Sequence, residues 1–297
     1  MFHVEHLKEC PICKGTKTTF FLTCKDFTVT QEEFDIVLCE NCGFKYTNPR
    51  PEPLSIGKYY ESENYVSHSN TKAGYINKVY HFIKKIAINN KIKIIEDLKP
   101  NNKRILDIGC GTGSFLNAIK KRGWMVKGIE PNDKARNEAI NQYSLDISDE
   151  GVIKDLRGKD FSVITLWHVM EHVHSLKQRV TEIHDLLVEG GFAIIAVPNN
   201  TSWDAIYYKE NWAAYDLPRH LYHFTPKTIK NLFINSGFKH FKSIPMKFDS
   251  YYVSLLSEKY KKSKFQAVKA FYAGIISNIK AKNDAEKYSS VIYIFQK

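Results

Sequence analysis

The stretch ILDIGCGTGSF, residues 105–115, is the most informative part of this sequence for predicting its fold. An apolar, β-rich run passes directly into Gly109, Gly111 and Gly113, and a helix is expected to begin after them. Glycines let the backbone turn sharply and approach a ligand closely, and the N-terminus of the following helix offers N–H groups to an anion. The stretch therefore predicts a strand, a ligand-binding loop and a helix.

The spacing of the glycines separates two kinds of nucleotide site. A dinucleotide-binding loop, G-x-G-x-x-G, requires glycine at position 114, where this chain has Ser114. Glu130 stands at the end of the next predicted strand, 21 residues after Gly109. A carboxylate there can accept hydrogen bonds from the hydroxyls of an adenosine ribose. Glu130 therefore favours a ligand site over a strand-to-helix joint that binds nothing.

From residue 103 onward, short β-rich runs alternate with amphipathic segments, which is typical of a parallel sheet built from βαβ units. The predicted strands are 104–108, 125–130, 162–167, 192–197, 238–245 and 290–295. The predicted helices are 114–122, 177–187 and 226–237, the second of them ended by Gly190 and Gly191. About 45 residues are inserted between the last two strands, an unusual length for a hairpin connection.

These residues resemble the class I S-adenosylmethionine (SAM)-dependent methyltransferases, in which an Asp-x-Gly-x-Gly-x-Gly motif holds the methionine end of SAM. Glu130 stands in the family's ribose-binding position. The resemblance covers residues 103–200 and implies an α/β Rossmann-like core, with a seven-stranded, mostly parallel sheet and helices on both faces. The cofactor contacts that it implies are Asp107, Gly109, Cys110, Gly111, Gly113, Glu130, Pro131, Asp149, Leu166, Trp167 and His168.

Four of the six cysteines form two Cys-x-x-Cys pairs, CPIC and CENC, separated by 25 residues. Two such pairs can converge on one tetrahedral metal ion, and in a chain without an export signal the spacing indicates zinc rather than disulfides. Redox-active or merely buried thiols are the alternative. The predicted zinc ligands are Cys10, Cys13, Cys39 and Cys42, with Cys24 an ordinary buried thiol and His3 and His6 as spare donors.

The sequence divides into four parts. They are a zinc-ribbon-like cysteine unit (1–52), a helical linker (53–100), the SAM-binding core (101–200) and a C-terminal acceptor-binding or lid region that completes the sheet and carries a helical insertion (201–297).

Local patterns give more detail within the first two parts. Strands are expected at 18–24 and 34–38, and the three prolines within 47–53 indicate a linker that is neither helix nor strand. Apolar residues at helical spacing predict a helix over 75–98, interrupted by a polar turn at 89–91.

The order of these parts is similar to that of bacterial methyltransferases of sugar, polysaccharide and other secondary biosynthesis, including zinc-containing sugar C-methyltransferases. The run DLPRHLYHFTPKTI, residues 216–229, belongs to this likeness. The stretch around MEHV is also similar to the quinone O-methyltransferases. Those enzymes carry a metal-binding carboxylate where this chain has His168, so their metal site is not carried over. The resemblance implies methyl transfer to a small or carrier-linked, sugar-like acceptor.

Histidines are the candidates for a general base. Methyl transfer from a sulfonium is an in-line displacement, so the protein mainly aligns the acceptor and removes its proton. A hydroxyl, a protonated amine or a carbon acid needs a base, whereas a thiolate does not. In HVMEH, His168 and His172 lie one turn apart if the run is helical, and His220 and His223 could approach from the C-terminal side.

Each of these histidines could instead be a hydrogen-bonded wall residue of the site. HVMEH also spells H-x-x-E-H, the pattern of the inverted zinc proteases. Its place directly after a buried strand in a methyltransferase-like core argues against a protease.

The insertion carries an apolar stripe flanked by lysines. A lid or dimer helix is the first interpretation, and a membrane-surface helix near a lipid-linked acceptor is the second. The stripe is Phe265, Val268, Phe271, Tyr272, Ile275, Ile276 and Ile279, and its lysines are Lys264, Lys269, Lys280 and Lys282. Upstream, an aromatic group suits either a wall for a ring-shaped acceptor or a packed core. This group is Trp203, Tyr207, Tyr208, Trp212 and Tyr215.

Composition limits the function classes. The 297 residues are 43% hydrophobic and 25% charged, close to the globular average. No apolar run of about 18 residues and no signal-peptide pattern occurs, so we expect a cytoplasmic protein without a membrane span.

The net charge is +11, and residues 201–297 carry 16 Lys and Arg against 7 Asp and Glu. Only 7 of the 43 cationic residues are arginine, the usual choice for recognising nucleic-acid phosphates.

Three functions follow from these observations. The first is a SAM-dependent methyltransferase acting on a small or carrier-linked intermediate, with homodimerisation and peripheral membrane contact left open. The second is an RNA methyltransferase that grips RNA with the zinc unit and the basic C-terminal part. Against it, the chain lacks the Asn/Asp-Pro-Pro-aromatic pattern of many base methyltransferases, and residues 1–55 carry 6 basic against 8 acidic residues. The third is a non-catalytic SAM-fold binding protein, against which the intact glycine motif counts.

Overall fold

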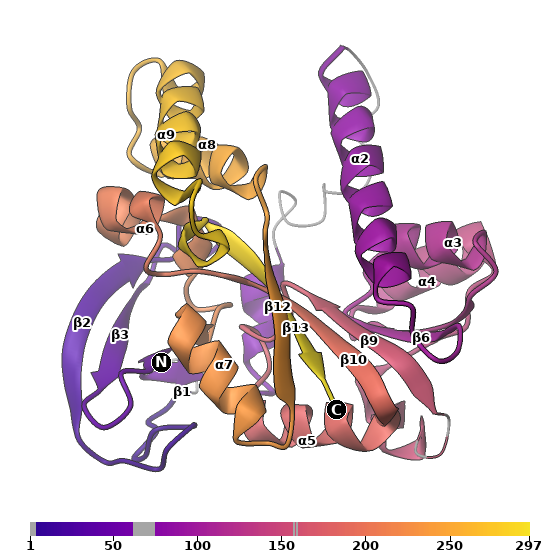
Figure 1. Ribbon diagram of the computed structural model, residues 1–297. Helices are drawn as coiled ribbons and strands as arrows, with labels where there is room; N and C mark the ends of the chain where they lie inside the picture. The colour runs from indigo at the N-terminus through magenta and orange to yellow at the C-terminus, as the bar shows by residue number, and fades with distance from the viewer. Residues whose placement is uncertain (1–3, 62–74, 157, 159) are drawn as a thin grey trace.

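A seven-stranded sheet forms the centre of the computed structural model, which describes residues 4–61, 75–156, 158 and 160–297 (Figure 1). The strand order is β12-β13-β10-β9-β6-β7-β8. Neighbours from β8 to β10 are parallel, whereas β13 runs antiparallel to both β10 and β12. The strands are β6 (Arg104–Ile108), β7 (Met125–Ile129), β8 (Ile147–Ser148), β9 (Phe161–Trp167), β10 (Leu187–Pro198), β12 (Lys239–Pro245) and β13 (Ser290–Gln296). This mostly parallel sheet confirms the Rossmann-like class I core.

Helices cover both faces of the sheet because successive residues of a buried strand point to opposite sides. In β6, Leu106 and Ile108 pack with α5 and α7 in one core, and Ile105 packs with α2 and α3 in another. The helices are α2 (Tyr75–Asp97), α3 (Ser114–Lys120), α4 (Asp133–Tyr143), α5 (Leu176–Leu186), α6 (Trp203–Tyr208), α7 (Pro226–Ile234), α8 (Asp249–Tyr260) and α9 (Gln266–Ala281). Short 3-10 helices lie at Ile56–Tyr60, Glu150–Leu156, Lys209–Asn211, Ala213–Tyr215 and Ala285–Lys287.

The cysteine unit forms a second sheet that includes a strand from the far end of the chain. Its order is β11-β4-β3-β2, and β1 pairs separately with β5. The strands are β1 (Val4–Glu5), β2 (Thr18–Lys25), β3 (Glu33–Cys39), β4 (Lys45–Thr47), β5 (Arg50–Pro51) and β11 (Tyr222–His223). Because β11 pairs with β4, the cysteine unit is joined to the C-terminal region by backbone hydrogen bonds.

Three local predictions are wrong. The segment 47–53 is not free of strands, since β5 pairs with β1 there. Helix α2 continues through 89–91, because Ile88, Ile92 and Ile95 keep one apolar face packed on the core while Asn89 and Asn90 are exposed. The helix after β9 ends at Leu186, and Gly190 and Gly191 lie inside β10, where the ladder with β9 shifts register.

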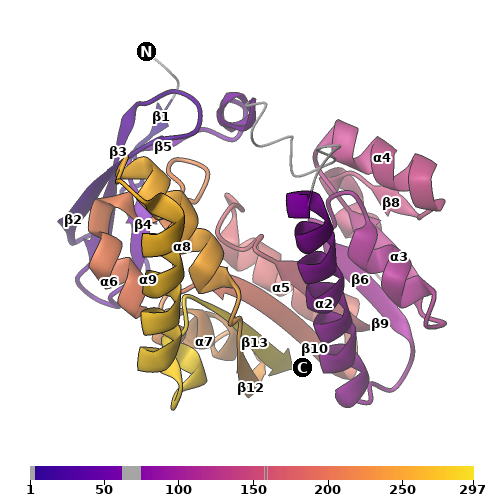
Figure 2. The same ribbon diagram turned by 90° about the horizontal axis from the view of Figure 1, so that it is seen from above.

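The inserted segment between β12 and β13 folds into the helix pair α8 and α9. Seen from above, this pair lies beside the cysteine unit and α6, and α2 stands apart from the pair, across the molecule (Figure 2). A third core joins the pair to the cysteine unit through Phe34, Ile36, Trp212, Val253 and Ala273. None of the helices in the described ranges is long and apolar enough to cross a membrane.

Candidate active site

The glycine loop connects β6 to α3 in the conformation that the sequence predicts. Gly109, Gly111 and Gly113 have φ of +74°, +54° and +72°, a region that other residues rarely adopt. A Cβ atom on Gly109 would collide with Val169, whereas one on Gly111 would meet nothing within 4 Å. Gly111 therefore faces open space, which a ligand could fill and a side chain would block.

Glu130 follows β7 and holds the loop from the side. Its Oε2 accepts a hydrogen bond from Gly111 N at 2.7 Å, and its Oε1 accepts one from Asn132 N at 2.9 Å. Burial raises the pKa of Glu130, and these two backbone bonds oppose the rise. Each carboxylate oxygen keeps a second lone pair for a ribose hydroxyl. The loop and Glu130 together fit the adenosine and methionine parts of SAM.

Asp107 lies beneath the loop, 2% exposed, and accepts a hydrogen bond from Thr165 Oγ1 at 2.6 Å. Burial raises its pKa to about 7, against the effects of that bond and of Lys91. The other predicted cofactor contacts vary in exposure. Leu166 is fully buried, Cys110 is half-buried, and Pro131 and Asp149 are exposed.

Trp167 ends β9 next to an unexpected cation. The Lys91 ammonium lies 4.3 Å from the centroid of the indole ring, and Phe115 packs edge-on against the same ring. Burial lowers the pKa of Lys91, and the charges of Asp107 and Asp249 oppose that change. The indole Nε1 is buried without a hydrogen-bond partner in the described part of the chain.

HVMEH is a turn rather than the helix that would place His168 and His172 one above the other. His168 has φ +58° and lies between two carboxylates, with Nδ1 3.3 Å from Glu171 Oε1 and Nε2 3.2 Å from Asp249 Oδ2. Burial alone would lower its pKa, but the hydrogen bonds and charges of Asp249 and Glu171 outweigh burial and raise it to about 10. His168 is therefore an imidazolium at neutral pH.

His172 and His220 meet edge to face, with ring centroids 4.6 Å apart. His172 Nδ1 lies 3.1 Å from Arg219 O and 3.0 Å from the Tyr60 hydroxyl, and His220 Nδ1 lies 2.9 Å from Ala214 O. Carbonyl oxygens only accept, so both Nδ1 atoms carry a proton, and the lone pair of each neutral ring lies on Nε2. Burial and the neighbouring His220 lower the pKa of His172 to about 4, which keeps it neutral.

Glu171 completes this group. It is fully buried, its Oε1 contacts His168, and its Oε2 has no hydrogen-bond partner in the described part of the chain. One ligand atom each from Glu171, His172 and His220 lie within 4.8 Å of one another. This donor set could take up a proton or hold a divalent cation.

His223 lies apart from this group. It sits in β11, 4% exposed, and its Nε2 is 3.1 Å from Thr47 Oγ1. Because that hydroxyl already donates to His220 O, His223 Nε2 carries the proton. His223 thus fastens β11 to the cysteine unit.

The four predicted zinc ligands converge. The sulfurs of Cys10 and Cys42 are 3.7 Å apart, those of Cys13 and Cys39 are 3.5 Å apart, and all four lie within 4.8 Å. Zinc–sulfur bonds of about 2.3 Å in a tetrahedron place sulfurs about 3.8 Å apart. Each Cys-x-x-Cys pair also lies in a tight turn. In these turns Lys14 N donates a hydrogen bond to Cys10 O, and Gly43 N donates one to Cys39 O. The site fits one structural zinc ion.

Cys24 is 3% exposed, as expected of a buried thiol, and His3 lies outside the described residues.

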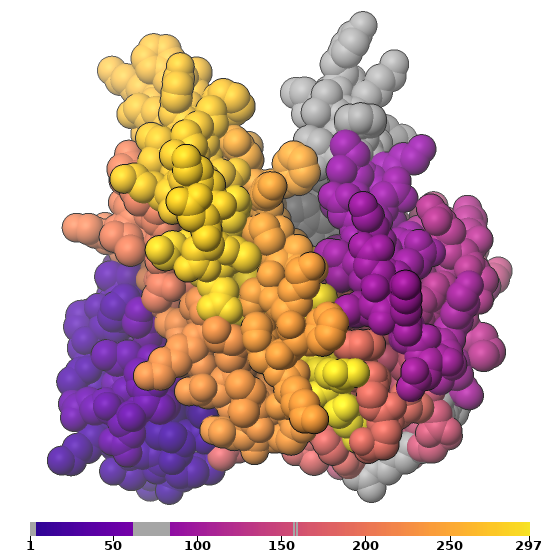
Figure 3. Space-filling model, in the orientation of Figure 1, coloured from indigo at the N-terminus to yellow at the C-terminus, as the bar shows by residue number. Residues whose placement is uncertain are grey.

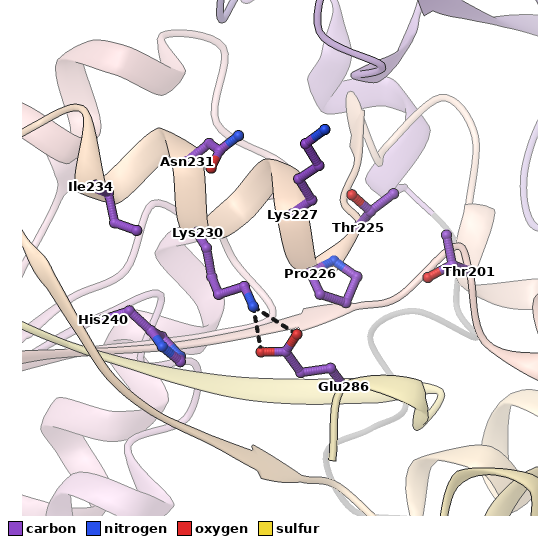
Figure 4. A pocket seen from close by; sticks show the side chains of 9 residues that line it. All are labelled: Thr201, Thr225, Pro226, Lys227, Lys230, Asn231, Ile234, His240 and Glu286. Atoms are coloured by element: carbon purple, nitrogen blue, oxygen red, sulfur yellow. Dashed lines mark hydrogen bonds and ion pairs between the residues drawn. The ribbon is translucent and has the colours of Figure 1, made fainter. Parts of the chain in front are cut away.

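A surface cavity of about 670 Å³ lies between α7 and β12 (Figure 4). Lys230 points into it and forms an ion pair with Glu286, with Nζ–O distances of 2.8 and 2.7 Å. None of the predicted site residues is among the described residues that line it. The cavity is thus separate from the glycine loop, and its Lys230 and Glu286 already pair with each other.

The aromatic group upstream of DLPRH is largely core. Tyr208, Trp212 and Tyr215 are 2%, 2% and 3% exposed, while Tyr207 is 49% exposed and stacks on Trp203. Sequence reasoning missed Lys91, Asp249 and Tyr60. No local pattern marks them, because each reaches the site from a distant part of the chain.

Comparison with known proteins places residues 81–242 in a family model described as a methyltransferase domain. The ubiquinone biosynthesis O-methyltransferase of Coxiella burnetii (strain RSA 493 / Nine Mile phase I) is 30% identical over 109 residues, which are 34% of this chain and 46% of that protein. The enzyme of the same name from Agrobacterium fabrum is 32% identical over 108 residues, 33% of this chain and 42% of that protein. The chain thus spans less than half the length of the curated relatives it matches.

Among solved structures, magnesium protoporphyrin IX methyltransferase from Synechocystis PCC 6803 with bound SAH superposes with a TM-score of 0.55. It is 11% identical and covers 83% of this chain and 100% of its own. A putative sarcosine dimethylglycine methyltransferase from Galdieria sulphuraria has a TM-score of 0.50 at 13% identity, covering 73% of this chain and 86% of its own. These likenesses establish the fold.

Proposed function

Because the chain belongs to the methyltransferase domain family, we propose that it transfers a methyl group from SAM to a hydroxyl of a small or carrier-linked biosynthetic intermediate. One observation carries the proposal. The glycine loop with Glu130 and the turn with Glu171 and His172 follow the carboxyl ends of neighbouring parallel strands, where ligands of open α/β sheets bind.

SAM, when bound, supplies an electrophilic methyl group on its sulfonium. The residues of this chain hold the cofactor and align the acceptor. Gly111 leaves room for the ligand backbone, Glu130 accepts from the ribose hydroxyls, and Trp167 ends the strand beside them. Alignment of this kind supplies much of the rate enhancement in an in-line displacement.

The proton of the acceptor hydroxyl goes to the pair His172 and His220. Both keep an Nε2 lone pair, and the Oε2 of Glu171 stabilises the imidazolium that forms. His168 is unsuited to this role in the free protein because it is already protonated between Asp249 and Glu171. His168 instead presents a positive charge to an acceptor oxygen.

A sugar-like hydroxyl is our first acceptor. The likeness to ubiquinone biosynthesis O-methyltransferases favours a phenolic hydroxyl as the second. Both agree with a site that removes a proton. The family match and these relatives favour a small-molecule enzyme over an RNA methyltransferase or a non-catalytic binding protein.

Calorimetric titration with SAM and, separately, with NAD tests the cofactor, together with elemental analysis for zinc. We expect SAM to bind, NAD not to bind, and about one zinc per chain. Absence of SAM binding by folded, zinc-loaded protein contradicts the proposal. A second equivalent of bound metal would assign Glu171, His172 and His220 to a cation instead of a proton.

Turnover of SAM in the presence of nucleotide sugars or phenols then tests the acceptor and the base. His172→Gln should lose at least about 100-fold in turnover, the usual range for a removed base, and keep its affinity for SAM. His184→Gln is the matched control, because His184 lies on α5 and packs on Phe238 rather than on the proposed base. Equal loss in both variants would mean that the pair His172 and His220 is structural.

A further inference from the structure

The face of helix α9 that points toward the rest of the protein is packed against neighbouring helices. Its buried residues are small, and they pack against α8 and α6. Gly274 shows how closely α8 approaches, since a Cβ atom there would lie 2.5 Å from Cδ1 of Tyr251. The buried residues are Ala270, Ala273, Gly274, Ser277 and Ala281. The helix is therefore held to the body mainly by small side chains, together with Phe271, which packs on Tyr251.

The outer face of α9 is also apolar. Phe265 precedes the first turn of the helix, and Val268, Tyr272, Ile276 and Ile279 follow at intervals of three or four residues, so these four share one side of it. The exposed fractions of the five residues, in chain order, are 79%, 54%, 61%, 39% and 57%. Figure 3 shows the α8–α9 pair standing out from the body of the molecule. A contiguous exposed apolar face of this kind marks an interaction surface.

Lysines border this outer face. Lys269 and Lys280 lie along one side of it, and Lys261, Lys262 and Lys264 precede the helix, all of them exposed. No acidic residue occurs between Glu258 and Asp284. The helix thus combines a row of large apolar side chains with flanking positive charge, the composition of helices that lie in a membrane interface.

The positive charge beside the outer face of α9 distinguishes between its possible binding partners. A second copy of α9 would bring lysines against lysines, and an RNA would pair with the lysines and leave Phe265, Tyr272 and Ile276 in water. An anionic phospholipid surface takes up both features, because acyl chains bury the apolar row and lipid phosphates attract the lysines. We infer that the outer face of α9 docks this protein on an anionic membrane surface.

Docking would place the membrane close to the candidate active site. Asp249 begins α8, and its Oδ2 lies 3.2 Å from His168 Nε2. If the proposed function holds, the docked helix pair would bring an acceptor carried on a lipid toward the turn at residues 168–172.

Co-sedimentation of the full, zinc-loaded chain with vesicles tests the inference. One vesicle is pure phosphatidylcholine and the other contains phosphatidylglycerol as well. We expect binding only to the mixed vesicles, weakening as salt is added. The variant Tyr272→Ser/Ile276→Ser should lose about tenfold or more in binding, as should Lys269→Glu/Lys280→Glu.

Two matched controls keep the test specific. Met125→Ser changes a side chain that is 64% exposed on β7, and Lys121→Glu reverses an exposed charge just after α3. Both should bind vesicles as the unchanged protein does. Circular dichroism confirms that every variant is folded.

Failure of the unchanged protein to bind the mixed vesicles would overturn the inference, and so would equal binding to both vesicles or equal losses in α9 and control variants. A dimer in solution that Tyr272→Ser/Ile276→Ser dissociates would overturn it in favour of a second copy. Vesicle binding requires no SAM, so protein that binds vesicles and not SAM would refute the proposed function alone.

Discussion

Glu130 both shapes the glycine loop and faces the expected ribose, so its charge should control cofactor affinity. Two hydrogen bonds from ribose hydroxyls to a carboxylate contribute about 1.5–3 kcal/mol each. We predict that Glu130→Gln weakens SAM binding by roughly 10- to 100-fold, since a neutral amide accepts more weakly. Calorimetric titration measures the change.

The zinc content of Glu130→Gln should stay the same, because its contacts are with Gly111 and Asn132. Asp155→Asn is the control, an exposed carboxylate in the 3-10 helix Glu150–Leu156. Equal SAM affinity in the unchanged protein and Glu130→Gln would show that the carboxylate does not bind the cofactor.

The pKa of His168 should depend on its contacts with the Asp249 and Glu171 carboxylates. We predict that Asp249→Asn lowers the pKa of His168 from about 10 toward the ordinary value of 6.5, because Glu171 alone then opposes burial. Nitrogen-15 chemical shifts of the imidazole measure this pKa. In the unchanged protein the raised pKa stabilises the fold fully below pH 6.5, and this stabilisation is lost as the pH rises through about 10.

The Asp249→Asn protein should therefore lose less stability between pH 7 and pH 10 than the unchanged protein, which urea unfolding at each pH measures. Asp284→Asn provides the comparison, as an exposed carboxylate beyond α9. An unchanged His168 titration in Asp249→Asn would mean that the ion pair does not form in solution.

The sequence predicts residues that act within one motif and misses those that act across the fold. Gly109, Gly111 and Glu130 were identifiable because a strand, a turn and a helix fix their geometry locally. The protonation of His168 was not identifiable, because it depends on Asp249, which is 81 positions away in an insertion without a local pattern.

Arg219 ties the loop before β11 to the cysteine unit. It is 1% exposed and contacts Asp26 at 3.1 Å and Asp216 at 2.6 Å. We predict that Arg219→Met lowers the free energy of unfolding by about 3–5 kcal/mol, because the buried Asp26 and the partly buried Asp216 lose their counter-charge. Urea unfolding measures the loss.

Arg122→Met is the matched control, since Arg122 forms an exposed ion pair with Glu96 and should cost less than about 1 kcal/mol. Similar losses in both variants would mean that Asp26 and Asp216 are protonated or hydrated once the cation is removed.

Among the secondary-structure elements, the predictions were right where an apolar run was bounded by glycine, as in β6, which Gly109 follows. They were wrong where polar residues or glycines served tertiary structure. Residues 89–91 were predicted to form a turn, but they lie inside a continuous helix that places the Lys91 ammonium over the Trp167 ring. Gly190, with φ +75°, permits an irregularity inside β10 rather than ending a helix.

Considered as a whole, the molecule has two halves that meet at the candidate active site. The glycine loop and Glu130 hydrogen-bond with their own neighbours in the core. His220 is held from the cysteine unit, because Thr47 Oγ1 donates to His220 O and β4 pairs with β11. The predicted zinc ion therefore supports the proposed base and not the cofactor loop.

Removal of zinc with a chelator should lower turnover while leaving SAM binding largely unchanged. We predict that turnover with a hydroxyl acceptor falls by at least about tenfold as β4 and β11 loosen and His220 shifts, since small misplacements of catalytic groups are costly. The affinity for SAM should change by less than about twofold, corresponding to less than about 0.4 kcal/mol. Calorimetry and turnover on the same samples measure both, and added zinc should restore turnover. A parallel loss of SAM affinity would mean that the cysteine unit holds the entire core together, and unchanged turnover would mean that the base is positioned without it.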